Sequence, residues 1–212
     1  MEKQEIRTFG RRHGKKLSAR KTNLVENILP GLYPNESEKA DILEIGFGAG
    51  EHVRELALNN PNKIIIGAEP FVNGVAALLS GICDENDNII SEYKNIRIWP
   101  DDVRLMLNGK KFQFSEIWIL HPDPWPKARH EKRRLLSAEF LNLLSGHIAQ
   151  NGKIIIGTDH WEYYDWIVDQ VKNTNLNIDS NEIGLVQTRY QAKNMAGTIE
   201  PKYLVLGHGT NN

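Results

Sequence analysis

Carboxylate side chains follow the predicted β-strands of this chain, and they are well suited to bind polar groups of a ligand. The apolar runs end in Glu44, Glu69, Asp101 or Asp102, Asp123 and Asp159. Ligands of an open α/β sheet bind outside the carboxyl ends of its strands, so these acids predict one ligand site along one sheet edge. A metal site is not expected, because His121, His160 and His208 are scattered and form no closed ligand spacing.

Three glycines at alternate positions mark the first candidate site. Gly46, Gly48 and Gly50 follow a predicted strand at 42–45 and precede a predicted helix that begins near Glu51. Glycine at such a turn lets a ligand approach backbone N–H groups at the helix N-terminus. The dinucleotide fingerprint requires a glycine at position 51, so a NAD site loses support. An ordinary glycine-rich turn is the alternative to a nucleoside-cofactor site.

The acids around this loop match a different cofactor. Glu44 lies two residues before the first glycine, and Glu69 lies 19 residues after the last one, at the end of the next strand. This arrangement resembles the S-adenosylmethionine site of Rossmann-fold methyltransferases, with Glu69 about where an acid meets the ribose diol. Asp101 or Asp102 is expected near the adenine, although either residue also suits the N-cap of the following helix.

The stretch from His121 to Arg134 is the second candidate site. Pro122, Pro124 and Pro126 exclude helix and strand, so Asp123 is expected on a stiff loop at the carboxyl end of a central strand. A carboxylate buried there without a ligand would be unpaired, which disfavours a purely structural loop. A carboxylate can instead accept the N–H groups on the Watson–Crick edge of guanine. The residues expected to complete a guanine pocket are Lys127 or Thr158, with Asp159.

Two basic segments predict an anionic partner, although the formal net charge of the 212 residues is −1. Residues 1–21 carry eight Lys and Arg against two Glu, and residues 127–134 carry five against one Glu. Residues 1–21 have no sustained apolar period, so we expect a flexible arm; a solubilising tail is the alternative interpretation. Together the two segments favour contacts with RNA phosphates. The expected phosphate ligands are Arg11, Arg12, Arg129, Lys132, Arg133 and Arg134.

Four motifs occur together within residues 41–209. They are Glu44-x-Gly46-Phe47-Gly48-x-Gly50, Pro122-Asp123-Pro124-Trp125-x-Lys127-x-Arg129-His130-x-Lys132-Arg133-Arg134, Thr158-Asp159 and Gly207-His208-Gly209. In these motifs the chain resembles the tRNA (guanine-N7-)-methyltransferase family, for which the proline-bracketed motif is highly specific. The resemblance implies S-adenosylmethionine as cofactor and a guanine in the variable loop of tRNA, at position 46, as substrate. It also implies that a single chain acts, as a monomer or weak homodimer.

The resemblance also assigns roles to the matching residues. The residues implied at or beside the cofactor are Glu44, Glu69, Asp101 and Asp123. Asp123 is also the implied catalytic residue, and Lys127 and Asp159 are implied to contact the RNA. The chain departs from the family's Thr-x-aromatic-Glu motif, because its Thr and Glu are two apart with no aromatic between them. We expect the substrate pocket to include Gly197, Thr198, Ile199 and Glu200, although Thr198 equally matches the family's threonine with one residue deleted.

The chemistry of guanine limits the role of Asp123. Atom N7 carries a lone pair and no proton, so its methylation needs no general base. We therefore predict that Asp123 orients the base and stabilises its developing positive charge. One alternative is a class I methyltransferase that acts on a small molecule or a protein, which has no evident need for two basic segments. Another is a non-catalytic RNA-binding protein that keeps the cofactor fold.

Strands and helices must position these sites, and the apolar pattern predicts both. Buried runs predict strands at 42–45, 63–68, 96–99, 114–120 and 153–157, with helical patterns between them. One of these helices is expected to extend from Leu135 through Ile148 to Gly152, and two further strands are expected around a loop at 189–200. The expected fold is α/β, a Rossmann-like, doubly wound and mostly parallel sheet with helices on both faces, in a single domain of the class I methyltransferase type.

We divide the chain into a basic arm at 1–21, a short helix and linker at 22–40, and a methyltransferase domain at 41–212. The hydrophobic content of 40% is ample for the core of one such domain. The single Cys83 cannot form an internal disulfide, and no apolar run reaches bilayer length. The N-terminus lacks a secretory segment. The chain is therefore expected to be cytoplasmic, without a membrane partner.

Overall fold

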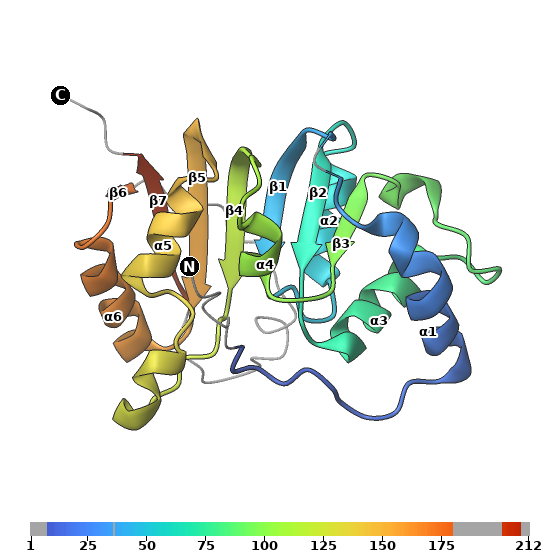
Figure 1. Ribbon diagram of the computed structural model, residues 1–212, viewed down its shortest axis with the longest axis horizontal. Helices are drawn as coiled ribbons and strands as arrows, with labels where there is room; N and C mark the ends of the chain where they lie inside the picture. Colours follow the sequence, from blue (N-terminus) through green and yellow to red (C-terminus); the bar gives the residue numbers. More distant parts are fainter. Residues whose placement is uncertain (1–7, 36, 180–200, 209–212) are drawn as a thin grey trace. The chain divides into compact units, whose positions relative to one another are not determined.

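The computed structural model describes residues 8–35, 37–179 and 201–208, and helices alternate with strands along most of that length (Figure 1). The strands are β1 (Ala40–Ile45), β2 (Ile64–Ala68), β3 (Ile96–Trp99), β4 (Phe114–Leu120), β5 (Ile148–Thr158), β6 (Leu176–Asp179) and β7 (Lys202–His208). The α-helices are α1 (Ala19–Asn23), α2 (Glu51–Asn59), α3 (Val72–Ile82), α4 (Val103–Leu107), α5 (Ala138–Ser145) and α6 (Trp161–Val171). Shorter helical turns are η1 (Leu24–Ile28), η2 (Leu29–Leu32), η3 (Ser91–Tyr93) and η4 (Ala128–Arg133).

The strands form one sheet in the order β3-β2-β1-β4-β5-β7-β6. β2 pairs with β3 in parallel, and so does β4 with β5, whereas β7 is antiparallel to both β5 and β6. The predicted α/β fold with a mostly parallel sheet is confirmed. The two strands expected around residues 189–200 are β6 and β7, which form the antiparallel end of the sheet.

The contacts of the chain divide it into two compact units, which are described separately. The first unit takes in Met1–Ala40 and Glu44–Phe112, and the second takes in Asp41–Leu43 and Gln113–Asn212. The boundaries expected at residues 21 and 40 stay predictions.

In the first unit, apolar helix faces pack around a buried strand. β2 is almost wholly buried, as its continuous β-branched run predicts. Helix α2 contacts β2 and buries Val53, Leu56 and Ala57, which recur at helical spacing. Helix α1 lies beside α3 (Figure 1). The side chains that α3 buries include Val75, Leu78, Leu79 and Ile82.

The single cysteine of the chain, Cys83, directly follows α3 in this first unit. Its side chain is a free thiol with a relative exposure of 6%. Burial raises the pKa of the Cys83 thiol, because a thiolate is poorly solvated away from water. The thiol is therefore protonated at neutral pH.

In the second unit, the helix expected from Leu135 through Ile148 is too long, and its second half is wrong. Helix α5 ends at its C-cap residue, Gly146. Ile148 instead begins β5, where it lies opposite Phe114 of β4. A buried apolar residue suits a helix or a strand equally well, so its sequence pattern alone does not distinguish them. The pairing with β4 determines the outcome here.

Candidate functional site

The glycine loop, residues 46–50, joins β1 to α2 in the first unit. Gly46, Gly48 and Gly50 have φ angles of 75°, 59° and 80°, in the left-handed region that favours glycine. A Cβ added at Gly46 or Gly48 would have no heavy atom within 4 Å, whereas one at Gly50 would meet the Leu78 side chain at 2.7 Å. The loop is therefore packed at its end and open at its first two glycines, as a loop that receives a ligand must be.

Glu69, the acid after β2, connects this loop to the start of α3 through its two carboxylate oxygens. Its Oε2 accepts the N–H of Gly48 and its Oε1 accepts the N–H of Phe71, each at 2.8 Å. The residue has a relative exposure of only 8%. A carboxylate oxygen can accept more than one hydrogen bond, so a carboxylate that fixes a loop is also a suitable group for binding a ribose hydroxyl. The expected cofactor contact of Glu69 stays a prediction.

Glu44, near the end of β1, lies against a residue that the sequence analysis did not single out. Its Oε2 is 3.0 Å from Nδ1 of His52, and both side chains have a relative exposure of 4%. His52 is the second residue of α2, so this contact joins the two elements that flank the glycine loop. The sequence contains a signal for this contact: His52 lies two residues after the last glycine, and the first turn of the helix brings its side chain back toward the end of the strand. The expected cofactor contact of Glu44 also stays a prediction.

The two acids after β3 have different environments. Asp102 is the N-cap of α4, and its carboxylate accepts the Arg104 N–H at 3.0 Å, the Arg104 guanidinium at 2.6 Å and the Thr8 hydroxyl at 2.8 Å. Burial acts to raise the pKa of Asp102, but the hydrogen bonds outweigh it and the pKa is lowered overall. Asp101 is more exposed and pairs with Arg12. Asp102 therefore fills the helix-cap role, and a contact with adenine is better suited to Asp101.

The described part of the basic arm follows a defined path along the start of α3. The carbonyl of Arg12 accepts the first N–H of α3 at 3.0 Å. The Asn73 side chain accepts the N–H of Gly14 at 2.8 Å and donates to the carbonyl of Lys15 at 2.7 Å. Residues 8–18 form neither helix nor strand, so these hydrogen bonds hold the segment. The flexibility expected for residues 1–21 stays a prediction.

The proline loop, residues 121–127, follows β4 in the second unit and contains neither helix nor strand, as its prolines predict. His121 and Trp125 have φ angles of 50° and 41°. Residues with side chains rarely adopt this left-handed region, and each such residue costs on the order of 1–3 kcal/mol. Asp123 lies between them and is exposed. Backbone strain of this kind concentrates at functional sites, which supports Asp123 as a site residue.

Asp159 lies beside the start of the proline loop. It directly follows β5, and its Oδ1 is 4.0 Å from Nδ1 of the buried His121. Burial lowers the pKa of His121, and the negative charge of Asp159 partly opposes that effect. The N–H of His121 donates to the carbonyl of Gly157 at 2.7 Å, which ties the loop to β5. The structure therefore brings Asp159 and this loop together at the carboxyl ends of two parallel strands.

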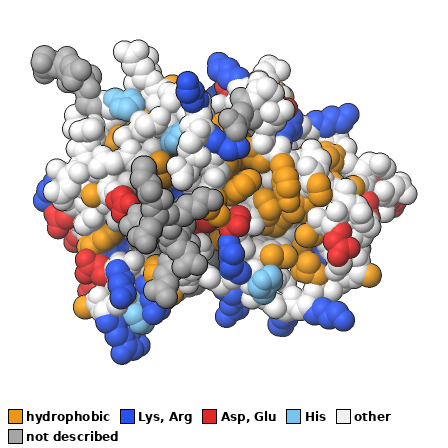
Figure 2. Space-filling view, viewed as in Figure 1, with side chains coloured by type: hydrophobic (Ala, Val, Ile, Leu, Met, Phe, Trp, Pro, Cys, Tyr) orange, Lys and Arg blue, Asp and Glu red, His pale blue; other side chains and the backbone are white. Residues whose placement is uncertain are grey.

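The five cations of the second basic segment fall into two groups. Lys127, Arg129 and Lys132 are exposed, and Figure 2 shows blue side chains gathered over η4. Arg133 and Arg134 are only partly exposed and lie over aromatic rings. The Cζ atom of Arg133 is 5.0 Å from the centroid of the Trp125 ring, and Arg134 lies over the Tyr163 and Trp166 rings.

The remaining candidates lie outside these clusters. Gly197, Thr198, Ile199 and Glu200 lie outside the described residues. Among the residues that the structure does describe, no group of three or more His, Cys, Asp or Glu is arranged to hold a metal ion. Within the same residues, no helix combines the length and apolar character needed to cross a membrane.

Comparisons with known proteins give consistent results. The family model described as "Putative methyltransferase" matches residues 38–210. A tRNA (guanine-N(7)-)-methyltransferase of Neorickettsia sennetsu is 36% identical over 193 residues, covering 90% of this chain and 86% of the relative. The corresponding enzyme of Caulobacter vibrioides is 33% identical, covering 96% of each chain. Among solved structures, a glycopeptide N-methyltransferase, MtfA, complexed with S-adenosylmethionine has a TM-score of 0.55 at 9% identity, covering 82% of this chain and 89% of its own.

Proposed function

The chain belongs to the tRNA (guanine-N7-)-methyltransferase family, and from that membership we propose that it methylates N7 of a guanine in tRNA. S-adenosylmethionine is the methyl donor. The resemblance of the motifs further supports a guanine of the variable loop as the target. We also propose that one chain is sufficient, as a monomer or weak homodimer, and that it acts in the cytoplasm.

The residues of the first unit fit this cofactor. The open side of the glycine loop at Gly46 and Gly48 leaves room for a ligand against the backbone. The carboxylate of Glu69 is of the type that accepts ribose hydroxyls, and the carboxylate of Asp101 suits the exocyclic amine of adenine. Glu44 supports the loop through His52. When bound, the cofactor supplies an electrophilic methyl group on a sulfonium.

The observation that carries the substrate assignment is the proline loop. Asp123 is exposed between two left-handed residues, and Lys127 and Asp159 of the same unit are exposed as well. Guanine N7 already carries a lone pair, so Asp123 acts by orienting the base and balancing its growing positive charge. Correct alignment can lower a barrier by about 7–11 kcal/mol in favourable cases. A fixed carboxylate adds electrostatic stabilisation to that effect.

Phosphate contacts complete the proposed RNA site. The exposed cations Arg129 and Lys132 on η4, with Arg11 of the arm, suit the phosphates that flank the target nucleotide. Such contacts release counterions, so the logarithm of the binding constant falls linearly with the logarithm of the salt concentration. A binding constant for tRNA that does not change with salt would contradict these contacts.

The decisive experiment is mass spectrometry of nucleosides after unmodified tRNA is incubated with the chain and S-adenosylmethionine. We expect 7-methylguanosine, and an Asp123→Asn variant, which keeps the size of the side chain but loses its charge, should form it about 100-fold more slowly. Absence of 7-methylguanosine from the tRNA, with the methyl group found only in protein or small molecules, would overturn the tRNA assignment. Near-normal turnover by Asp123→Asn would overturn the electrostatic role of Asp123.

A further inference from the structure

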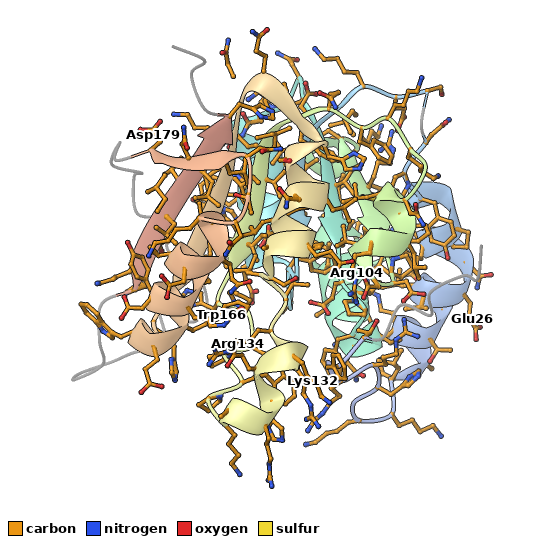
Figure 3. All side chains as sticks on the ribbon, turned by 60° about the vertical axis from the view of Figure 1, so that its left-hand side comes forward. Glu26, Arg104, Lys132, Arg134, Trp166 and Asp179 are labelled. Carbon is orange, nitrogen blue, oxygen red and sulfur yellow. The ribbon has the colours of Figure 1, made fainter. Side chains whose placement is uncertain are left out.

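Arg134 is the last cation of the second basic segment, and its guanidinium makes several contacts with other residues of the protein. Its Nε–H donates to the carbonyl of Pro124 at 2.9 Å. Its Cζ atom is 5.0 Å from the centroid of the Trp166 ring and 5.5 Å from that of Tyr163. Figure 3 shows Arg134 next to Trp166 and apart from Lys132. Arg134 therefore differs from the exposed cations that precede it.

The carbonyl that Arg134 binds belongs to the strained part of the proline loop. Pro124 directly follows Asp123, and the next residue, Trp125, has a φ of 41°. This carbonyl and the N–H of Trp125 belong to one planar peptide unit. A hydrogen bond to that oxygen therefore fixes the orientation of the Pro124–Trp125 peptide, one residue beyond Asp123. Strained conformations persist only where surrounding contacts hold them.

The aromatic residues under Arg134 form a rigid support on α6. Tyr163 is fully buried, and its ring centroid lies 5.7 Å from that of Trp166. The indole Nε1–H of Trp166 donates to Oε1 of Glu131 in η4 at 2.8 Å. Arg133, the residue before Arg134, lies over the Trp125 ring of the loop. The proline loop is thus attached to α6 through Arg134 and to η4 through Trp125.

We propose that Arg134 is a positioning residue that holds Asp123 in place for methyl transfer, and that it is not a phosphate ligand. This inference rests on the proposed function and replaces the phosphate contact expected for Arg134 from the sequence. Arginine suits this role because its planar fork can stack on two aromatic rings and still donate to a carbonyl. Lysine keeps the charge but has neither the plane nor the fork.

The variants Arg134→Lys and Arg134→Ala together separate positioning from phosphate binding, and Arg134→Lys tests positioning. We expect kcat to fall about 10–100-fold, because Asp123 is misplaced. We expect Arg134→Ala, which removes the charge, to keep the slope of tRNA affinity against salt, because no phosphate contact is lost. The matched variant Arg129→Ala should weaken tRNA binding and reduce the salt slope by about 1, as loss of one phosphate contact does. Normal kcat in Arg134→Lys, or a reduced salt slope in Arg134→Ala, would overturn the inference.

A second measurement does not depend on catalysis. Hydrogen–deuterium exchange of the peptide covering residues 121–127 reports few backbone amides, because three of its seven residues are prolines. We expect faster exchange in Arg134→Lys and in Trp166→Leu than in the unmodified chain, and unchanged exchange in Arg129→Ala. Equal exchange in all four proteins would overturn the inference. Trp166→Leu removes an aromatic ring under Arg134 and leaves the charge of the chain unchanged. It therefore tests whether this ring helps to hold the proline loop, even if Arg134→Lys folds poorly.

These results distinguish the two proposals. If the unmodified chain forms no 7-methylguanosine, the proposed function fails, while the exchange experiment still decides whether Arg134 holds the loop. If the unmodified chain is active and Arg134→Lys is equally active, only the positioning role fails.

Discussion

At the scale of single residues, Glu69 connects the glycine loop to the start of α3. A Glu69→Gln variant keeps the size of the side chain but has only one acceptor oxygen, so either Gly48 or Phe71 loses its acceptor. A hydrogen bond to a charged group contributes about 1.5–3 kcal/mol. We expect the Kd for S-adenosylhomocysteine, measured by calorimetry, to rise about 10–100-fold.

Glu55→Gln provides the control for this change, because Glu55 is exposed on α2 and loses the same charge. The Kd of this control should stay within about twofold of the unmodified chain, since exposed charges contribute little. Equal Kd values for Glu69→Gln and Glu55→Gln would show that Glu69 does not hold the site.

Asp102 gives a prediction for acid stability. Its pKa is lowered in the folded chain, so its contribution is fully present above the ordinary aspartate pKa, about 4, and is lost as pH falls below that value. We expect Asp102→Asn to lower the free energy of unfolding by about 1–3 kcal/mol at pH 7, with a smaller difference below pH 4. Urea unfolding at several pH values measures this. A difference that does not change with pH would contradict the assignment.

Residue types and spacing were sufficient to find the residues with the strongest local signals. Gly46, Gly48 and Glu69 could be identified because glycines at alternate positions and an acid after a strand form a recognisable pattern. The support that Arg134 receives from Tyr163 could not be predicted, because it depends on how α6 packs in three dimensions. The sequence showed the charge of Arg134 but not its neighbours, so a phosphate contact was the natural interpretation.

At the scale of elements, α3 packs so closely against the glycine loop at Gly74 that there is no space for a side chain there. A Cβ added at Gly74 would lie 2.2 Å from the carbonyl oxygen of Gly48. Since that oxygen belongs to backbone, α3 or the loop must move. We expect Gly74→Ala to lower the free energy of unfolding by about 1–3 kcal/mol, and to weaken binding of S-adenosylhomocysteine.

Gly81 lies in the same helix and provides a matched control. The three heavy atoms nearest to a Cβ there all belong to the flexible Arg54 side chain, at 3.2–3.3 Å. Because alanine favours helix more than glycine by about 1 kcal/mol, Gly81→Ala should be neutral or stabilising. Urea unfolding of both variants checks this prediction. Equal free energies of unfolding for Gly74→Ala and Gly81→Ala would mean that α3 or the glycine loop shifts at little energetic cost.

The arm offers a similar comparison. A Cβ at Gly14 would lie 2.8 Å from Oδ1 of Asn73, whereas one at Gly10 would have no heavy atom within 4 Å. We expect Gly14→Ala to release the arm from α3 and to increase tryptic cleavage after the nearby Arg12 and Lys15. Gly10→Ala should be cleaved at the unmodified rate. Equal cleavage of both variants would show that the contact with Asn73 does not hold the arm.

The elements that could be predicted were those with long, distinctive patterns. The continuous apolar run of β2 identified that strand, and the helical spacing in α2 identified that helix. The boundary between α5 and β5 could not be predicted, because Ile148 is apolar in both possible structures and only its position opposite Phe114 determines which forms. Sheet pairing joins residues that are far apart in sequence, so a local pattern does not contain it.

At the scale of the whole molecule, the net charge and the distribution of charge give different indications. A formal charge of −1 does not favour binding to RNA, but the two basic segments do. The fold class followed from alternating strands and helices, because few architectures bury such a pattern. The three-dimensional structure adds that two cations of the second basic segment, Arg133 and Arg134, contact aromatic rings of the protein itself. Composition does not reveal these contacts.

Cys83 has a practical consequence for measurements on the whole molecule. Because the chain has only this thiol and it is buried, alkylating reagents should reach it only when the protein opens. The alkylation rate therefore measures how often the protein opens far enough to expose Cys83. A ligand that binds only the folded state stabilises it by RT ln(1 + [L]/Kd). If Cys83 is exposed by global unfolding, S-adenosylhomocysteine at about 100 times its Kd should therefore lower the alkylation rate about 100-fold. A rate that the ligand does not change would mean that Cys83 is reached by a local movement that leaves the cofactor site intact.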